Sequence, residues 1–280
     1  MSEKEKKYFS LDFVKKEELK ILAEFDRVCR KNQLRYSLSG GTLIGAVRHG
    51  GFIPWDDDVD VLMLREDYDR LCCIFQDEFP DNYFLQNYKT DKKYPNNFAK
   101  LLNLNIYALI EETEALDIKK GLCIDIFPID RVTINPFMRK FDIGILSVIN
   151  LLKYSSLNNI NENAVKRIIH RLLFMVARMV DTSRLNNVEN KIRTKYNGGN
   201  SKITFADYIK PPYRLGRKDI YPYDIFLDYL EMDFEGLSLM AIAGYEQYLR
   251  ITYGDYMTLP PEHDRVPGHN FYYYDAGVKT

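Results

Sequence analysis

Cysteine is scarce in this sequence, and the spacing of the few cysteines excludes a common structural use. The 280 residues include four: Cys29, the adjacent Cys72 and Cys73, and Cys123. None belongs to a C-x-x-C pair, so a structural zinc site is not expected. We therefore expect a reduced, cytosolic chain.

An excess of charge and a long apolar run are also missing. There are 39 Lys and Arg against 40 Asp and Glu, a net charge of −1, whereas a dedicated nucleic-acid binder would usually be basic. No stretch reaches the ~18 apolar residues that span a bilayer. The first ten residues, MSEKEKKYFS, are charged and lack the apolar core of a signal peptide. We expect a cytoplasmic protein that binds no nucleic acid and can still touch a membrane surface.

The first 130 residues alternate between helical and strand patterns. Leu19, Leu22 and Phe25 recur at three- and four-residue spacing, which predicts an amphipathic helix over residues 15–31. Further helices are predicted at 42–49 and 66–79, and strands at 34–39, 58–64, 83–88, 97–110 and 122–126. Together these elements predict an α+β fold around a small mixed sheet with flanking helices.

A glycine pair followed by an acidic strand carries the clearest functional signal. Gly40 and Gly41 precede a predicted helix, whose N-terminal backbone N–H groups attract phosphate. Asp58 and Asp60 alternate with a valine and so share one face of a strand. Two carboxylates aimed at one point repel each other unless a cation lies between them. This pattern indicates a metal-dependent site for a phosphorylated ligand.

A third acidic residue, Asp125, lies among apolar neighbours in the sequence GLCIDIFPID. An isolated buried carboxylate is costly, so such a residue normally pairs with a cation or with hydrogen-bond donors. If this strand lies beside the first acidic strand, Asp125 supplies a third metal ligand or a general base. The alternative is a carboxylate held by backbone donors at a strand end.

Three more residues are candidates for binding phosphate. The hydroxyl of Thr42 follows the glycine pair and would help to seat a phosphate group. Arg48 would clamp phosphate through its guanidinium, or form a salt bridge with the nearby aspartates. Lys100, on a predicted strand, would reach phosphate or face solvent.

The composition changes near residue 135. Residues 135–200 hold eleven Lys and Arg against four Asp and Glu, a difference of +7 in a nearly neutral chain. We expect a core over residues 1–133, a basic helical insertion over 134–200, and a segment over 201–280 that packs back on the core. Helical patterns cover 141–152 and 167–180. The insertion is either a subdomain with its apolar stripes inward or an interfacial patch attracted to anionic lipid or an anionic polymer.

These motifs resemble the LicD family of phosphocholine transferases, which belongs to the nucleotidyltransferase-fold superfamily. The superfamily pattern is a glycine turn at a helix start, an acidic-hydrophobic-acidic strand and a third acidic strand. The residues that match it are Gly40-Gly41-Thr42, Asp58-Val59-Asp60 and Asp125. The sequence RHGGFIPWDDD, residues 48–58, is typical of LicD itself. The resemblance covers about residues 20–131 and, more loosely, 232–263.

The resemblance implies transfer of phosphocholine from CDP-choline to a sugar hydroxyl of a cell-surface glycan precursor, of teichoic acid or lipopolysaccharide type, on a lipid carrier. Asp58 and Asp60 would hold one or two Mg²⁺ ions, and Asp125 would share a metal or deprotonate the acceptor. Two alternatives remain open. One is a transferase for another CDP-linked donor, such as a CDP-polyol. The other is a catalytically silent, membrane-associated binding module.

Overall fold

The computed structural model describes residues 6–111, 113–154, 181–199, 201–206 and 220–274. Within these residues, the centre of the fold is a seven-stranded mixed sheet of order β2-β3-β6-β5-β4, which β7 and β8 extend from β6. Strands β3 and β6 are parallel, and the other pairs are antiparallel. The strands are β2 (Ser37–Leu38), β3 (Asp60–Leu64), β4 (Tyr83–Gln86), β5 (Ala99–Asn103), β6 (Leu122–Arg131), β7 (Ile203–Ala206) and β8 (Ile220–Pro222). The predicted α+β class is confirmed.

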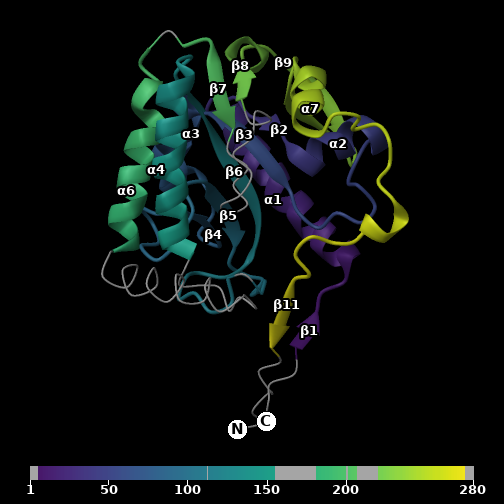
Figure 1. Ribbon diagram of the computed structural model, residues 1–280. Helices are drawn as coiled ribbons and strands as arrows, with labels where there is room; N and C mark the ends of the chain where they lie inside the picture. The colour runs from purple at the N-terminus through teal and green to yellow at the C-terminus, as the bar shows by residue number, and fades with distance from the viewer. Residues whose placement is uncertain (1–5, 112, 155–180, 200, 207–219, 275–280) are drawn as a thin grey trace.

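Helices lie on both sides of this sheet (Figure 1). Helices α4 and α6 lie side by side at one side, and α1, α2 and α7 lie toward the other. The helices are α1 (Leu11–Lys31), α2 (Gly40–His49), α3 (Arg65–Glu78), α4 (Pro136–Tyr154), α6 (Thr182–Arg193) and α7 (Tyr245–Tyr253). Short 3₁₀ turns occur at η1 (Thr194–Tyr196), η3 (Tyr223–Phe226) and η4 (Glu262–Asp264).

Helix α1 confirms the predicted amphipathic helix and begins four residues earlier. Ser10 caps it by accepting a hydrogen bond from the backbone N–H of Phe13 at 3.3 Å, which starts the helix at Leu11. Its buried stripe includes Leu22, Phe25 and Cys29, all fully inaccessible to solvent. All four cysteines are free thiols.

Helix α2 begins at Gly40, two residues before the predicted start, and ends at His49, with Gly50 as its C-cap. Gly50 adopts φ +67° and so forms the left-handed cap that favours glycine. The chain then turns back across the helix at Gly45. A Cβ added to Gly45 would lie 2.4 Å from the carbonyl oxygen of Gly51, so only glycine allows this approach. The crossing returns the chain toward β3.

All five strand predictions need correction at their ends. Strand β2 covers only Ser37–Leu38 of the predicted 34–39, and β4 ends at Gln86 instead of residue 88. Strand β3 starts at Asp60, so Asp58 lies just before it, and β5 ends at Asn103 instead of residue 110. The side-chain oxygen of Asn103 accepts the backbone N–H of Asn105 at 3.0 Å, which turns the chain away. Strand β6 continues to Arg131 because its later residues pair with β3 and then with β7.

Three strand pairs that involve the C-terminal part of the chain were not predicted, and the first is β7 with β8. Strands β9 (Tyr229–Phe234) and β10 (Leu237–Ile242) form a hairpin, and β1 (Lys6–Tyr8) pairs with β11 (Tyr272–Tyr274). The hairpin contacts the core at β2, where the hydroxyl of Ser37 accepts the backbone N–H of Ile242 at 3.0 Å. The C-terminal residues therefore pack directly against the first part of the chain.

Helices α4 and α6 join each other through buried charged groups. The ammonium of Lys153 on α4 bonds to Glu189 and, at 3.0 Å, to Asn186 on α6. Asn186 also donates to the carbonyl of Tyr94 at 3.0 Å, which links the pair to the core. The predicted helix 141–152 lies within α4, and the predicted helix 167–180 lies outside the described residues. Across the part of the chain that the structure describes, no helix has both the length and the apolar content of a membrane span.

Candidate active site

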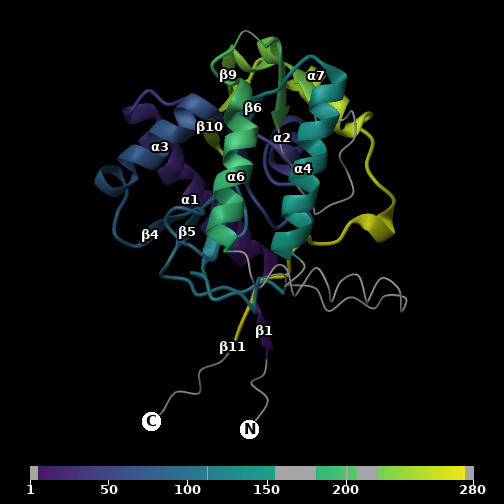
Figure 2. The same ribbon diagram turned by 60° about the vertical axis from the view of Figure 1, so that its left-hand side comes forward.

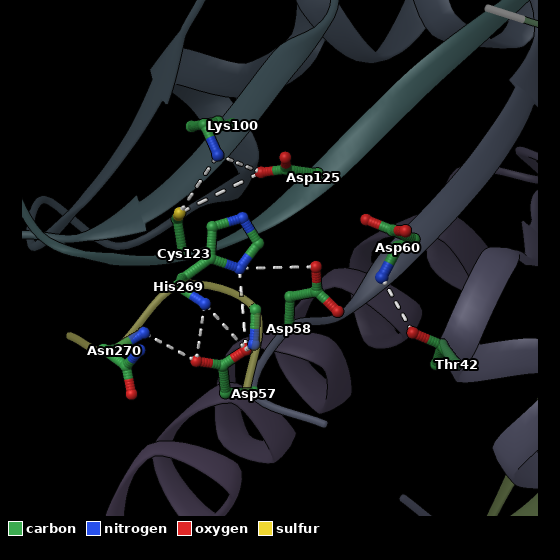
Figure 3. Close-up of polar contacts among 10 residues, drawn as sticks. Thr42, Asp57, Asp58, Asp60, Lys100, Cys123, Asp125, His269 and Asn270 are labelled. Atoms are coloured by element: carbon green, nitrogen blue, oxygen red, sulfur yellow. Dashed lines mark hydrogen bonds and ion pairs between the residues drawn. The ribbon is translucent and has the colours of Figure 1, made fainter. Parts of the chain in front are cut away.

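Strand register brings two of the predicted carboxylates together. Asp60 on β3 lies directly opposite Asp125 on the parallel strand β6, and the backbone N–H of Asp125 donates to the carbonyl of Val59 at 2.8 Å. Neighbours across a ladder share one face of the sheet. Asp58 precedes β3 and lies near both (Figure 3). The three carboxylates are only partly buried, so a ligand can reach them.

Lys100 is held by one of these carboxylates. It lies opposite Asp125 on β5, and its Nζ donates to Asp125 Oδ1 at 2.5 Å. The alternative of a solvated strand face is wrong, because the Lys100 side chain is only 15% exposed. Gln86 on β4 lies opposite Lys100 in turn. A polar row therefore crosses four adjacent strands, starting at Asp60.

The site holds more negative charge than its own residues neutralise. Burial and the nearby charge of Asp58 hold the pKa of Asp60 well above its usual range. Burial raises the pKa of Asp58 as well, and burial together with Asp58 raises the pKa of Asp56 to about 8. Carboxylates in this state gain from a bound cation, and their hard oxygen donors are those that Mg²⁺ prefers.

The donor type therefore fits the predicted Mg²⁺. Among the described residues, no three His, Cys, Asp or Glu side chains already form a metal-binding group. The assignment of Asp58, Asp60 and Asp125 as metal ligands stays a prediction.

At the start of α2, the place expected for a phosphate lies next to a side-chain carboxyl. A Cβ on Gly41 would lie 2.3 Å from a carboxylate oxygen of Asp56, so that carboxylate lies against the helix start. Thr42 Oγ1 accepts the backbone N–H of Asp60 at 2.9 Å, which ties α2 to β3. Phosphate binding by Gly40, Gly41 and Thr42 stays a prediction.

Arg48 points toward the C-terminal part of the chain. Its Nη1 donates to the carbonyl of Tyr256 at 2.9 Å, and its Nε to His49 Nε2 at 2.9 Å. Burial and the nearby Arg265 lower the pKa of Arg48. For the residues described, no ion pair joins Arg48 to the aspartates, so the salt-bridge alternative finds no support. Its role as a phosphate clamp stays a prediction.

Sequence reasoning did not identify the contact between Asp57 and His269. The Asp57 carboxylate accepts backbone N–H groups from Gly268 at 2.8 Å, His269 at 3.0 Å and Asn270 at 2.9 Å. Although burial opposes this, the side chain of His269 and these backbone bonds lower the pKa of Asp57 to about 2. The imidazole Nδ1 of His269 thereby lies 3.5 Å from Asp58 Oδ2 (Figure 3). No local signal predicts this contact, because more than 200 residues separate its two sides.

Glu18 on α1 is a second residue that the sequence did not reveal. Its carboxyl is fully buried, and in the described structure neither oxygen has a hydrogen-bond partner. Burial, and then the charge of Asp58, raise the pKa of Glu18 well above its usual range. Helix α1 therefore adds another carboxyl to the acidic site.

Comparison with known proteins identifies the family. Residues 33–133 match the family described as LicD/FKTN/FKRP, nucleotidyltransferase domain. Over 263 residues the chain is 31% identical to the lipopolysaccharide cholinephosphotransferase LicD of Haemophilus influenzae, covering 90% of this chain and 92% of that protein. The chain belongs to the LicD family. It is a phosphotransferase enzyme, and the family match spans the sheet strands from β2 to β6 that carry the carboxylates.

Other proteins are similar to shorter parts of this LicD-family chain. The ribitol 5-phosphate transferase FKRP of Homo sapiens is 59% identical over 34 residues, which is 12% of this chain and 7% of that protein. An uncharacterised protein of Rickettsia prowazekii is 43% identical over 47 residues, or 17% of this chain. The loop that carries His269 lies outside the matched nucleotidyltransferase domain.

Proposed function

We propose that this protein transfers phosphocholine from CDP-choline to a sugar hydroxyl of a cell-surface glycan precursor. The acceptor is of lipopolysaccharide or teichoic acid type and is built on a lipid carrier at the inner face of the membrane. One observation carries the proposal: the similarity to a lipopolysaccharide cholinephosphotransferase extends over 90% of this chain. The pairing of Asp60 with Asp125 across β3 and β6 supports it, because such a site suits phosphoryl transfer.

Asp58, Asp60 and Asp125 would hold one or two Mg²⁺ ions. The bound metal would neutralise charge on the donor diphosphate. Between the two roles considered for Asp125, we favour metal binding over general base catalysis. The ammonium of Lys100 already holds one of its oxygens at 2.5 Å, and the register of Asp125 opposite Asp60 places it beside another proposed metal ligand.

The remaining groups would position phosphate. A phosphate at the start of α2 would take the place that Asp56 has against Gly41. Arg48, on the last turn of the same helix, would contribute a guanidinium. Phosphoryl transfer depends mainly on such positioning and on charge neutralisation.

A CDP-polyol donor is the second candidate. The 59% identity to a ribitol 5-phosphate transferase favours it, but that similarity covers 12% of the chain. The alternative of a catalytically silent binding module is wrong, because the family match and the similarity to a cholinephosphotransferase identify an enzyme.

A donor assay separates these functions. The protein is incubated with Mg²⁺, a glycan acceptor and either CDP-choline or CDP-ribitol, and CMP release and the acceptor mass are measured. We expect transfer from CDP-choline alone. Transfer from CDP-ribitol alone would establish the polyol alternative, and the absence of transfer from both donors by folded protein would contradict both enzymatic readings.

A further inference from the structure

Helix α4 carries an apolar stripe on its outer face. Phe137, Phe141 and Val148 are 82%, 63% and 55% exposed. Their spacing of four and seven residues places them on one side of the helix. Ile134, just before the helix, is 69% exposed and Met138 is 43% exposed. We call these five residues the α4 stripe.

The opposite face of the same helix accounts for its packing. Asp142, Leu146, Ile149 and Lys153 are all buried, and Lys153 is bonded to α6. An amphipathic helix needs only one such inward face to dock on its own protein. The α4 stripe is therefore a second apolar surface that the fold itself does not require, and clusters of exposed bulky apolar side chains usually mark a binding surface.

Exposed basic side chains occur on α4 and on the neighbouring helix α6. Lys140 is exposed on α4, and Arg184 and Lys191 are exposed on α6, which lies beside α4 (Figure 2). Two of the acidic groups nearby are paired with cations: Glu189 binds Arg193 and Lys153, and Asp142 binds Lys195 and also Tyr196. Asp181, the N-cap of α6, is exposed and accepts a backbone N–H from Ser183. The exposed charge of this surface is therefore mainly positive.

We propose that the α4 stripe rests on an anionic lipid bilayer. Phenylalanine side chains on a helix that lies in the membrane plane enter the boundary between headgroups and acyl chains. Lysine and arginine beside them are attracted to anionic headgroups. Charge complementarity favours this occupant, because a second copy of the chain would bring the same positive charges together. The inference does not depend on which group the enzyme transfers.

Vesicle flotation tests the proposal with the full chain. Vesicles of phosphatidylcholine alone are compared with vesicles that also contain phosphatidylglycerol. We expect binding to the anionic vesicles, weakened by added salt. The variant F137S/F141S should reduce the bound fraction by at least about tenfold, since it removes two bulky apolar anchors. K140E should also weaken binding, through charge alone.

The matched control is Tyr107→Ser, which removes an aromatic side chain that is 57% exposed elsewhere on the protein. It should bind vesicles like the wild type. F137S/F141S and Tyr107→Ser alter exposed side chains only, so thermal unfolding should confirm that both variants are folded. The proposal is overturned if the wild type does not bind anionic vesicles or if F137S/F141S binds them equally well. Sedimentation velocity adds a further criterion: a wild-type dimer that the double variant abolishes would assign the stripe to a second copy.

Discussion

At the scale of single residues, the carboxyl groups at the start of β3 differ in how they are held. Three backbone N–H groups stabilise the charge of Asp57, whereas burial raises the pKa values of Asp58 and Asp60, and neighbouring carboxylates raise them further. The hydrogen bonds to Asp57 hold a loop in place, whereas the cluster of Asp58 and Asp60 favours binding of a cation.

We predict that Asp60→Asn and Asp125→Asn each lower phosphocholine transfer by at least about 100-fold, because each removes a carboxylate proposed to hold Mg²⁺. Removing one charge also relieves repulsion, so metal-free Asp60→Asn should be at least as stable as the wild type. Transfer assays and urea unfolding measure the two effects. The control is Asp81→Asn, an exposed carboxylate in a turn. Wild-type turnover in Asp60→Asn would refute the metal assignment.

We predict that Asp57→Ala releases the C-terminal loop. The variant leaves the backbone N–H groups of residues 268–270 without their acceptor, at a cost of about 1–3 kcal/mol in unfolding free energy. Trypsin should then cut faster after Arg265, which mass spectrometry of the fragments detects. Asp255→Ala, in the same region, serves as the control because its carboxylate bonds only locally to Thr258. Equal cleavage rates in both variants would show that Asp57 does not restrain the loop.

At the scale of elements, the atoms around a glycine decide whether its replacement by alanine lowers or raises the stability of the protein. We predict that Gly45→Ala destabilises the protein by about 1–3 kcal/mol, since its Cβ would collide with the Gly51 carbonyl. Gly144→Ala is the matched control: it has open space around it on the exposed face of α4. That change should stabilise the protein by about 0.5–1 kcal/mol through helix propensity. Urea unfolding measures both, and a fully stable Gly45→Ala would show that α2 and the following loop can separate.

The contact between α4 and α6 should depend on pH. Burial alone would raise the pKa of Glu189, but the charges of Arg193 and Lys153 lower it to about 2 from 4.5. A lowered pKa gives stability that is fully present above the unfolded value and is lost as the pH falls toward 2.

We therefore predict that the unfolding free energy falls between about pH 4.5 and 2, with a contribution from Glu189 on the order of 3 kcal/mol. Glu189→Gln should be less stable than the wild type near neutral pH, because it leaves two buried cations without their carboxylate. The difference should shrink as the pH falls. Urea unfolding across this range provides the measurement, and a pH-independent difference would contradict the assignment.

At the scale of the whole molecule, the site joins parts of the chain that are far apart in sequence. Helix α1 supplies Glu18, the central sheet supplies Asp60 and Asp125, and the C-terminal loop supplies His269. A ligand that binds this site should therefore stabilise the complete fold and not only one element.

We predict that Mg²⁺ raises the melting temperature in a saturable way. At a Mg²⁺ concentration 100 times the Kd, binding would raise the unfolding free energy by about 2.7 kcal/mol. Asp60→Asn should lose the shift, while Asp81→Asn should keep it. Differential scanning calorimetry in chelated and Mg²⁺-containing buffers measures this effect. A full shift in Asp60→Asn would place the bound metal elsewhere on the molecule.

The parts of the fold and site that were predicted correctly depend on residues close together in the sequence. The stripe of Leu22 and Phe25 predicts α1, and glycine at 40–41 marks the start of α2. The end of β5 was missed because the Asn103 turn competes with a run of residues that favour strands. The role of Lys100 was not recognised, since its partner Asp125 lies on another strand.

The sequence by itself determined the acidic alternation at 58–60, the glycine turn, the amphipathic first helix and the α+β class. Local spacing and backbone preference fix each of these within a few residues. Only the tertiary structure decided that Asp60 faces Asp125, that Asp57 holds the loop of His269, and that α4 has one face inward and one outward. Strand register, loop docking and helix orientation depend on contacts between segments that are distant in the sequence. A local sequence pattern does not determine the free energies of such contacts.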